Sequence, residues 1–343
     1  MTAISAVDDT ATRQALDDVI SQIATAEARF SRFVPNSELM MLNHSRQMVV
    51  SDALYQMLER AMAMANFTQD LISPAIGGAL HAMGYQHSFD KLPTIISTAD
   101  SPAISHQSIT LEPSTKQVTL ADGVMLDLGG FAKLLTAIQV AQAFYHATQT
   151  PILLDAGGDM VCLGDMTHTP WMVHLPTAQD IRHSLNHDKW TAELPMASYD
   201  DLARLSAQGW RRYEHLDSPV IDLLTTAILS TSGIDYRHWQ ANGQMRHHLI
   251  HPSHARSHST DIINASVLIT PTDADDLHHS TNLAQSLSKL SCLLGISRML
   301  TWLVQHRLDH LGLSWIIHTP SGYQQWLNPA MQTALSTTSN HTM

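Results

Sequence analysis

The chain has few cysteines and few charges, and each shortage excludes a class of protein. It contains two cysteines in 343 residues, Cys162 and Cys292. A disulfide framework and a zinc site built from cysteines both need more thiols than that. Charged residues make up 15% of the chain and hydrophobic residues 44%, which suits neither a disordered chain nor a coiled coil. A chain of this length buries a large core and suggests roughly two domains.

Basic residues are also scarce, at 19 against 31 acidic residues, for a net charge of -12. There is no long run of Lys or Arg, so nucleic acid and anionic membranes are not expected partners. No apolar run approaches the about 18 residues of a membrane helix, so no transmembrane segment is expected. Residues 1–18 hold four acids and one arginine, unlike a signal peptide, and the expected location is therefore cytoplasmic.

Hydrophobic periodicity predicts helices and short strands that do not alternate strictly. Helices are expected at 11–30, 38–42, 52–66, 131–146 and 284–294, and strands at 108–111, 117–120, 124–128, 152–154, 160–163, 171–175, 228–233, 267–270 and 314–317. This mixture favours an α+β fold over a doubly wound sheet. Residues 177–219 are polar and weakly periodic, so they are expected to form an insertion, and residues 331–343 a disordered tail.

One segment places an acid, two glycines and a lysine where a strand would pass into a helix. It reads Met125-Leu-Asp-Leu-Gly-Gly-Phe-Ala-Lys133. The free N–H groups of a helix N-terminus bind anions such as a pyrophosphate, and Lys133 would add a positive charge. Asp127 could accept a hydrogen bond from a ribose hydroxyl or a ring N–H. On spacing alone, an ordinary strand-to-helix turn capped by Asp127 is the favoured interpretation.

Histidines are unusually frequent, with 22 in the chain and five between residues 247 and 258. On a helix, His247, His251, His254 and His258 would share one face and could bind a metal, but Pro252 argues against a continuous helix. A single histidine beside a polar pocket is the better candidate for a general base, because its pKa lies near neutrality.

An acidic run, Asp273-Ala-Asp-Asp276, is followed by Ser280 one helical turn later. Carboxylates and a hydroxyl at this spacing could hold magnesium, although a solvated loop or a helix start explains the run equally well.

Taken in chain order, six segments resemble one family, the FAD:protein FMN transferases of the ApbE type. The segments are Phe30–Leu39, Ser73–Gly77 with Met83–Tyr85, Leu126–Lys133, Leu154–Asp159, Thr231–Gly233 and His248–Pro252. The resemblance implies one domain of two α/β lobes over residues 1–330, with mixed or antiparallel sheets and flanking helices. It also implies magnesium-dependent cleavage of the FAD pyrophosphate and covalent transfer of FMN to a Thr or Ser of an acceptor flavoprotein subunit.

The resemblance also implies roles for particular residues. His248 would be the base that activates the acceptor hydroxyl, so it is expected to be partly buried, with His254 and His258 exposed. The FAD contacts would be Phe33, Leu71, Ile72, Ser73, Asp127, Lys133 and Ile250. The Mg²⁺ ligands would be the carbonyl of Gly130 together with Asp276 and Ser280.

The chain departs from the family pattern in several places. Ser73 and His251 stand where the family has Asp, and the strand that normally precedes the first helix is expected to be missing. Three pairs compete for the metal position: Asp276 with Ser280, Thr281 with Gln285, and Asn282 with Ser286. Only the first supplies a carboxylate. The alternatives to a transferase are therefore a non-catalytic flavin-binding relative with a weakened magnesium site, and an FAD pyrophosphatase that uses water as acceptor.

Overall fold

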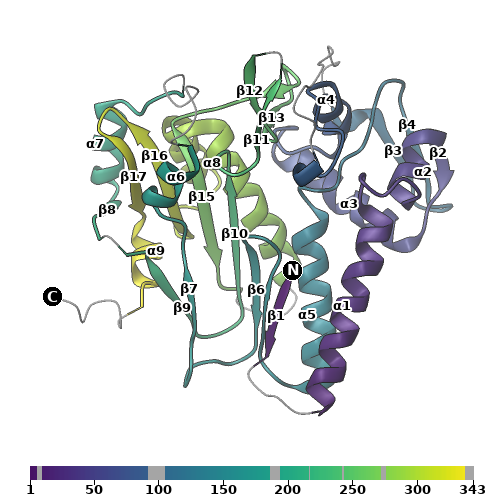
Figure 1. Cartoon of the computed structure of the whole chain (residues 1–343), viewed down its shortest axis with the longest axis horizontal. Helices are drawn as coiled ribbons and strands as arrows, with labels where there is room; N and C mark the ends of the chain where they lie inside the picture. Colours follow the sequence, from purple (N-terminus) through teal and green to yellow (C-terminus); the bar gives the residue numbers. More distant parts are fainter. Residues whose placement is uncertain are drawn as a thin grey trace. The chain divides into compact units, whose positions relative to one another are not determined.

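The computed structural model describes residues 1–5, 10–91, 105–185, 194–215, 217–241, 243–271 and 276–336. Internal contacts divide the chain into two compact units (Figure 1). Unit 1 comprises Met1–Leu16, Ala137–Tyr236 and Ser259–Met343, and unit 2 comprises Asp17–Thr136 and Arg237–His258. Two of the four boundaries fall inside helices, α1 (Thr10–Phe30) and α5 (Ala132–Thr148).

Unit 1 is built on an eight-stranded antiparallel sheet in the order β1-β5-β6-β10-β15-β16-β17-β8. Its strands are β1 (Thr2–Ser5), β5 (Ile152–Asp155), β6 (Asp159–Leu163), β8 (Arg211–Tyr213), β10 (Ala227–Gly233), β15 (Ile262–Ile269), β16 (Gly312–Thr319) and β17 (Gly322–Leu327). A separate ribbon pairs β7 (Trp171–His174) with β9 (Val220–Leu223). Helices together with antiparallel sheets confirm the predicted α+β class.

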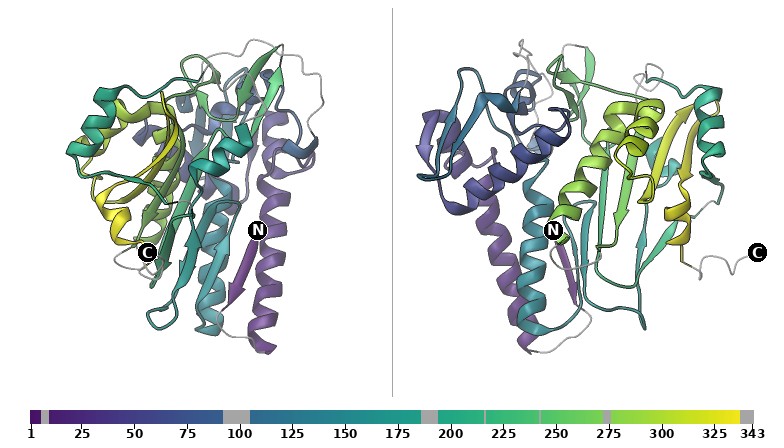
Figure 2. Two further views of the ribbon diagram at one scale, coloured as in Figure 1. Left: turned by 60° about the vertical axis from the view of Figure 1, so that its left-hand side comes forward. Right: turned by 180° about the vertical axis from the view of Figure 1, so that it is seen from behind.

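The two faces of this sheet are covered by different elements, a long helix α8 (Leu277–Gln305) and the β7–β9 ribbon (Figure 2). Successive side chains of β10 point to opposite faces of the sheet, so this one strand packs against both covering elements. The hydroxyls of Ser230 and Ser232 lie 3.1 and 2.9 Å from the hydroxyl of Ser288 on α8. Ala227 and Leu229 point the other way, into an apolar core shared with the ribbon.

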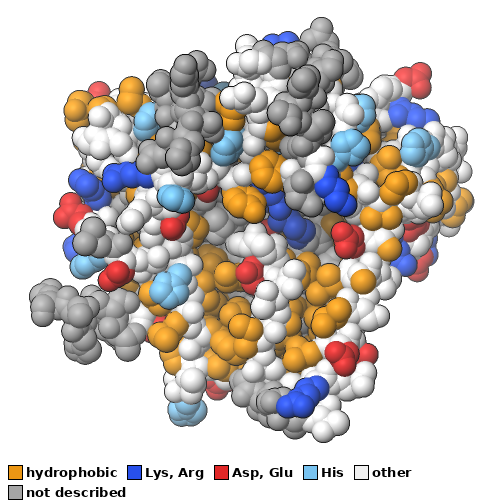
Figure 3. All heavy atoms as spheres, viewed as in Figure 1, with side chains coloured by type: hydrophobic (Ala, Val, Ile, Leu, Met, Phe, Trp, Pro, Cys, Tyr) orange, Lys and Arg blue, Asp and Glu red, His pale blue; other side chains and the backbone are white. Residues whose placement is uncertain are grey.

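The ribbon side of unit 1 keeps several apolar side chains in contact with solvent. Hydrophobic side chains gather in the lower middle of the face shown in Figure 3, over the ribbon and its neighbouring strands. Met172 on β7 is 62% exposed and Leu224, just after β9, is 45% exposed.

Helix α8 bends at Gly295, where φ is 70°. The carboxylate of Asp261 accepts from the Ile296 N–H at 3.0 Å and so starts the second half of the helix. By length and composition α8 could cross a membrane, but 61% of its apolar stretch is buried in the structure, which suits a core helix equally well.

The polar stretch 177–219 contains regular structure, which its sequence did not indicate. It holds α6 (Ala178–Leu185), α7 (Tyr199–Ala207) and β8, the last strand of the sheet. In α7 only Leu205 is buried, which explains why the apolar periodicity is weak.

Both chain ends carry structure that was not expected. The opening strand is present, since β1 pairs with β5 with Thr2 opposite Asp155. At the other end, α9 (Pro329–Thr333) begins before the expected tail, and Met331 is fully buried in the apolar core. The N–H of Ser336 donates to the carbonyl of Val220 at 2.7 Å, so residues up to 336 pack against the ribbon. Residues 337–343 lie outside the described part of the chain.

Unit 2 contains helices, a three-stranded sheet in the order β2-β4-β3, and two hairpins. Its remaining elements are α2 (Glu38–Ser45), β2 (Gln47–Val49), α3 (Asp52–Phe67), η1 (Pro74–Ile76), α4 (Gly77–Ala82), η2 (Phe89–Lys91), η3 (His106–Ser108), β3 (Ile109–Glu112), β4 (Gln117–Leu120), β11 (His238–Ala241), β12 (Gln244–His247), β13 (Ile250–His251) and β14 (Arg256–Ser257). Ser37 caps α2 as predicted, its hydroxyl accepting from the Met40 N–H at 3.1 Å.

Candidate functional site

The segment 124–128, predicted to be a strand, forms no strand and belongs to no sheet. Its backbone is held by a side chain instead: the Leu126 N–H donates to Asn43 Oδ1 at 2.8 Å, and Asn43 Nδ2 donates to the Leu126 carbonyl at 3.1 Å. The Asp127 N–H donates to the Pro74 carbonyl at 2.9 Å. These partners replace the ladder of a sheet and fix the backbone that carries Asp127.

Helix α4 begins directly against the same segment. A Cβ atom on Gly77 would lie 2.7 Å from the carbonyl oxygens of both Met125 and Leu126. The backbone of Gly77 is in the ordinary helical region, with φ of -56°. The position therefore needs glycine for close approach to another backbone rather than for an unusual conformation.

Asp127 is buried and binds two groups. Its Oδ1 accepts from the Gly129 N–H at 2.8 Å, which confirms the predicted cap of the turn before α5. Its Oδ2 accepts from Nε of Arg32 in a buried ion pair. Asp127 is 7% exposed and Arg32 is 8% exposed, so both charges are removed from water and depend on each other.

Aromatic rings surround the guanidinium of Arg32. Its Cζ lies 4.2 Å from the ring centroid of Phe33 and 4.7 Å from that of Tyr85. The Tyr85 ring in turn lies 5.0 Å from Trp239 of β11, whose Nε1 donates to the Met83 carbonyl at 2.9 Å. The outermost ring is Phe33, which is 37% exposed and thus offers an aromatic surface to a ligand.

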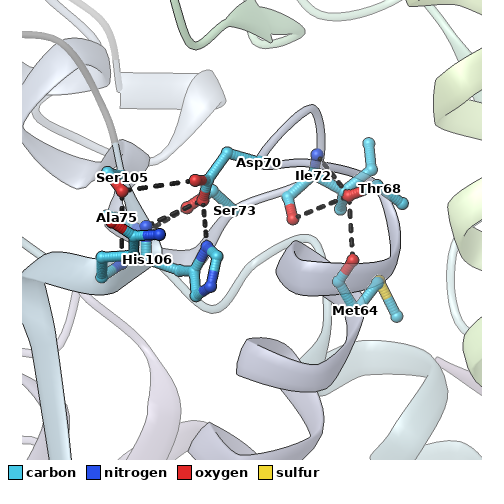
Figure 4. A network of polar contacts seen from close by, with 9 residues as sticks. Met64, Thr68, Asp70, Ile72, Ser73, Ala75, Ser105 and His106 are labelled. Carbon is cyan, nitrogen blue, oxygen red and sulfur yellow. Dashed lines mark hydrogen bonds and ion pairs between the residues drawn. The ribbon is translucent and has the colours of Figure 1, made fainter.

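The loop that carries the predicted contacts Leu71 to Ser73 is held at both ends by side chains (Figure 4). The Thr68 hydroxyl donates to the Met64 carbonyl at 2.9 Å and accepts from the Ile72 N–H at 3.1 Å. The Ser73 hydroxyl accepts from the Ala75 N–H at 3.3 Å and caps η1. Ser73 thus has a structural role at the position where the family has Asp.

Asp70 anchors the middle of this loop. Its Oδ1 accepts from the His106 N–H at 2.8 Å and lies 2.8 Å from Nδ1 of the same histidine (Figure 4). Asp70 has a φ of 65°, an uncommon conformation for a residue other than glycine. Next to it, Leu71 is half-buried, whereas Ile72 and Ser73 are buried.

The histidine-rich residues 247–258 contain the end of β12 and the β13–β14 hairpin rather than a helix, so the single helical face considered for metal binding is wrong. Within the described ranges, no cluster of three or more His, Cys, Asp or Glu could hold a metal. His248 is half-buried and His254 exposed, as expected. His258 is half-buried rather than exposed, because its ring packs edge-on against His251 with the centroids 5.0 Å apart.

His247, immediately before His248, is 1% exposed. Burial lowers the pKa of His247 well below its usual value, and the neighbouring histidines and Arg246 lower it further. Its Nδ1 lies 3.3 Å from the Leu249 N–H and accepts from it, which requires an unprotonated Nδ1. The turn that carries His248 therefore rests on a neutral neighbour.

Met83 links the hairpins to the aromatic rings. The Ser257 hydroxyl donates to the His247 carbonyl at 2.7 Å and lies 3.7 Å from the sulfur of Met83. Ile250, which is buried, lies opposite Ser257 in the β13–β14 hairpin. This chain of contacts joins Phe33, Asp127 and Ile250 within unit 2. Arg32, Tyr85 and Trp239 also belong to it and were not predicted, although Arg32 and Tyr85 stand inside matching segments.

Helix α5 starts just beyond Asp127. The Leu128 carbonyl accepts from the N–H groups of Phe131 and Ala132, at 2.9 and 2.8 Å. Lys133 is the second residue of α5 and is half-buried, as is Gly130 in the turn. The turn, the helix start and the lysine thus follow one another as the sequence predicted.

The predicted carboxylate and hydroxyl ligands of the metal, Asp276 and Ser280, belong to unit 1 at the start of α8. The Ser280 hydroxyl donates to Asp276 Oδ2 at 3.1 Å. Asp276 is half-buried and Ser280 is 2% exposed. Gly130 belongs to unit 2. Asp273 and Asp275 lie outside the described residues.

Neither competing pair supplies a carboxylate, and the hydroxyl of each is bonded to its own helix. The Thr281 hydroxyl donates to the Leu277 carbonyl at 2.7 Å, and the Ser286 hydroxyl donates to the Asn282 carbonyl at 2.8 Å. Among the three pairs, Asp276 with Ser280 presents the donor set closest to what Mg²⁺ prefers.

Comparison with known proteins gives consistent matches. The sequence model of the ApbE family matches residues 1–309. A protein of Treponema pallidum (strain Nichols) named FAD:protein FMN transferase is 24% identical over 283 residues, covering 77% of this chain and 69% of its own. The crystal structure of the ApbE protein of Thermotoga maritima has a TM-score of 0.70 at 15% identity, covering 97% of this chain and 94% of its own. The flavin transferase ApbE of Vibrio cholerae has a TM-score of 0.67 at 14% identity, covering 96% of this chain and 92% of its own.

Proposed function

Since the chain belongs to the ApbE family, we propose that it is an FAD:protein FMN transferase. The observation that carries the proposal is the arrangement around Asp127 in unit 2. A buried carboxylate, an exposed aromatic ring on Phe33 and the start of α5 with Lys133 come together there. These are the kinds of group that hold a flavin ring and a pyrophosphate.

The residues present suit FAD. The exposed ring of Phe33 can stack on the isoalloxazine, and the half-buried Leu71 can pack beside it. The N-terminal end of the α5 helix dipole and the ammonium of Lys133 can hold the pyrophosphate. Ile250, with Ile72 and Ser73, would complete the cofactor contacts.

In the proposed reaction, the oxygen of an acceptor Thr or Ser attacks the phosphorus of the FMN half of FAD. A new P–O bond forms, the bond from that phosphorus to the bridging oxygen breaks, and AMP leaves. The hydroxyl proton passes to His248, which we propose as the base. Because this chemistry needs alignment and charge neutralisation more than covalent catalysis, fixed positions for the two reactants are the main contribution of the protein.

We propose Asp276 and Ser280 as magnesium ligands. One carboxylate and one hydroxyl in mutual contact fit a metal whose remaining ligands are water and substrate phosphates. When bound, Mg²⁺ would neutralise charge on the pyrophosphate. The carbonyl of Gly130 stays a prediction. Calorimetry of Mg²⁺ with FAD present should show weaker binding in Asp276→Ala, and an unchanged titration would remove Asp276 from the ligand set.

The experiment that tests the function compares His248→Ala with His254→Ala, a matched change at an exposed histidine of the same segment. Covalent flavin on an acceptor flavoprotein subunit is measured with FAD and Mg²⁺, and FAD affinity is measured separately. Loss of a general base typically costs about 10²- to 10⁴-fold in rate, so His248→Ala should lose that much transfer and keep its FAD affinity. Equal loss of transfer and of affinity would assign His248 a structural role.

A further inference from the structure

The guanidinium of Arg32 has a buried donor that the protein does not use. The Arg32 side chain is 3% exposed, and Nε is paired with Asp127. In the part of the chain that the structure describes, Nη2 of Arg32 is buried and has no hydrogen-bond partner. An unsatisfied donor on a charged group is costly, and such groups in folded proteins call for an explanation.

We propose that Nη2 of Arg32 binds a ring carbonyl oxygen of the flavin, next to a ring N–H that donates to Asp127. This inference rests on the proposed function and adds a specificity-determining residue to it. The pyrimidine part of an isoalloxazine carries an N–H flanked by two carbonyl groups. The Arg32–Asp127 pair offers the complementary donor and acceptor side by side, because Nε of Arg32 already contacts the Asp127 carboxylate.

Charge favours a ring carbonyl over a phosphate as the partner. Asp127 neutralises the guanidinium at contact distance, and its carboxylate would repel a pyrophosphate brought to the same place. A neutral carbonyl oxygen meets no such repulsion. The phosphates have separate candidates in Lys133 and the start of α5.

The surroundings of the guanidinium also suit a flat aromatic ligand. Phe33 and Tyr85 lie against it, and their ring centroids are 5.6 Å apart. Of the two rings, Phe33 is 37% exposed and can rotate toward solvent, whereas Tyr85 is buried. Phe33, once rotated, would lie against the face of a flavin ring whose edge forms the new hydrogen bond with Nη2.

The test uses the two halves of FAD as separate probes, riboflavin for the ring and ADP for the phosphates. Their affinities are measured by calorimetry on the parent protein, on Arg32→Lys and on Arg29→Lys. Lysine can still pair with Asp127 but has no planar second donor. Arg29 is the matched control, because its Nε lies 3.4 Å from Glu38 in an ordinary, partly exposed ion pair.

Arg32→Lys should weaken riboflavin binding by roughly 10- to 100-fold, the effect of one hydrogen bond from a charged group, and leave ADP binding unchanged. Loss of ADP affinity alone would assign Arg32 to the phosphates and overturn the inference. Equal loss for both probes, or no loss for either, would also overturn it. A parent protein that binds neither FAD nor riboflavin would refute the proposed function itself, which the other outcomes leave standing.

A second measurement needs no variant and so does not depend on how Arg32→Lys folds. Riboflavin analogues with sulfur in place of one or the other ring carbonyl oxygen are titrated into the parent protein. Sulfur is a weaker acceptor, so one of the two analogues should bind less tightly than riboflavin. Equal affinity for riboflavin and both analogues would exclude a bond from Nη2 to either oxygen.

Discussion

Replacing Gly77 with Ala should damage the site without touching a ligand. The new methyl group would lie 2.7 Å from two backbone oxygens and 2.8 Å from the Leu126 carbonyl carbon. Backbone atoms cannot rotate away as a side chain can, so α4 or the segment 125–127 has to move. The Asp127 N–H donates to Pro74, three residues before Gly77, and this bond would be disturbed as well.

The expected change in stability for Gly77→Ala follows from two opposing effects. Overpacking in a well-packed interior costs about 1–3 kcal/mol, and alanine gains about 0.5–1 kcal/mol over glycine within a helix. We therefore expect Gly77→Ala to lower the free energy of unfolding by about 1–2 kcal/mol. FAD affinity should fall too, because the displaced segment carries Asp127.

Gly78→Ala is the matched control, since it makes the same change one residue later in the same helix. It should be neutral or slightly stabilising. Urea titrations give the unfolding free energies, and fluorescence titration gives the FAD affinities. If Gly77→Ala were as stable as Gly78→Ala and bound FAD as tightly as the parent, the close approach of α4 to residues 125–127 would be refuted.

Three further predictions concern buried polar groups. The pKa of His247 lies below its unfolded value of 6.5, so the unfolded chain takes up the extra proton, and the free energy of unfolding falls by up to about 1.4 kcal/mol per pH unit below that pH. In urea titrations at a series of pH values, His247→Gln should lack this contribution to the pH dependence of stability. An unchanged pH dependence would contradict the assignment. Asn43→Leu should lower the free energy of unfolding by about 2–4 kcal/mol in urea titrations, because the buried N–H and carbonyl of Leu126 lose their partners. A decrease well below about 1 kcal/mol would argue against this role of Asn43. Burial raises the pKa of the Cys162 thiol to about 12, so this thiol should be alkylated far more slowly in native than in unfolded protein near neutral pH. Equal rates of alkylation would show that the thiol is accessible in the native protein.

Local signals in the sequence predicted much of the fold. Ser37 before Glu38, and the apolar positions after Asp52, set helix starts that the structure reproduces. These features depend on residues within one or two turns, where capping and periodicity act. The strand predicted at 124–128 failed because its backbone partner is the side chain of Asn43, 83 residues away, and no local pattern contains that information.

At the candidate site, too, the features set by neighbouring residues were predicted and those set by distant residues were not. Asp127, Lys133 and the glycine turn were predicted because they are contiguous in sequence. Arg32 was missed because its significance comes from an ion pair with a residue 95 positions away. The spacing of residues 247–258 was considered as a helical face, but Pro252 lies in the turn between β13 and β14, and the pairing of these two strands sets the fold there.

The most direct test of the central claim is the balance between AMP released and flavin bound covalently to protein. FAD, Mg²⁺ and an acceptor flavoprotein subunit are incubated with the parent protein, and AMP, free FMN and flavinylated acceptor are quantified together. The account predicts one AMP for each FMN attached, no free FMN, and no attachment to an acceptor whose Thr or Ser is replaced by Ala. AMP released with an equal amount of free FMN would indicate a pyrophosphatase, and bound FAD without any AMP would indicate a non-catalytic flavin-binding protein, so either result would contradict the account.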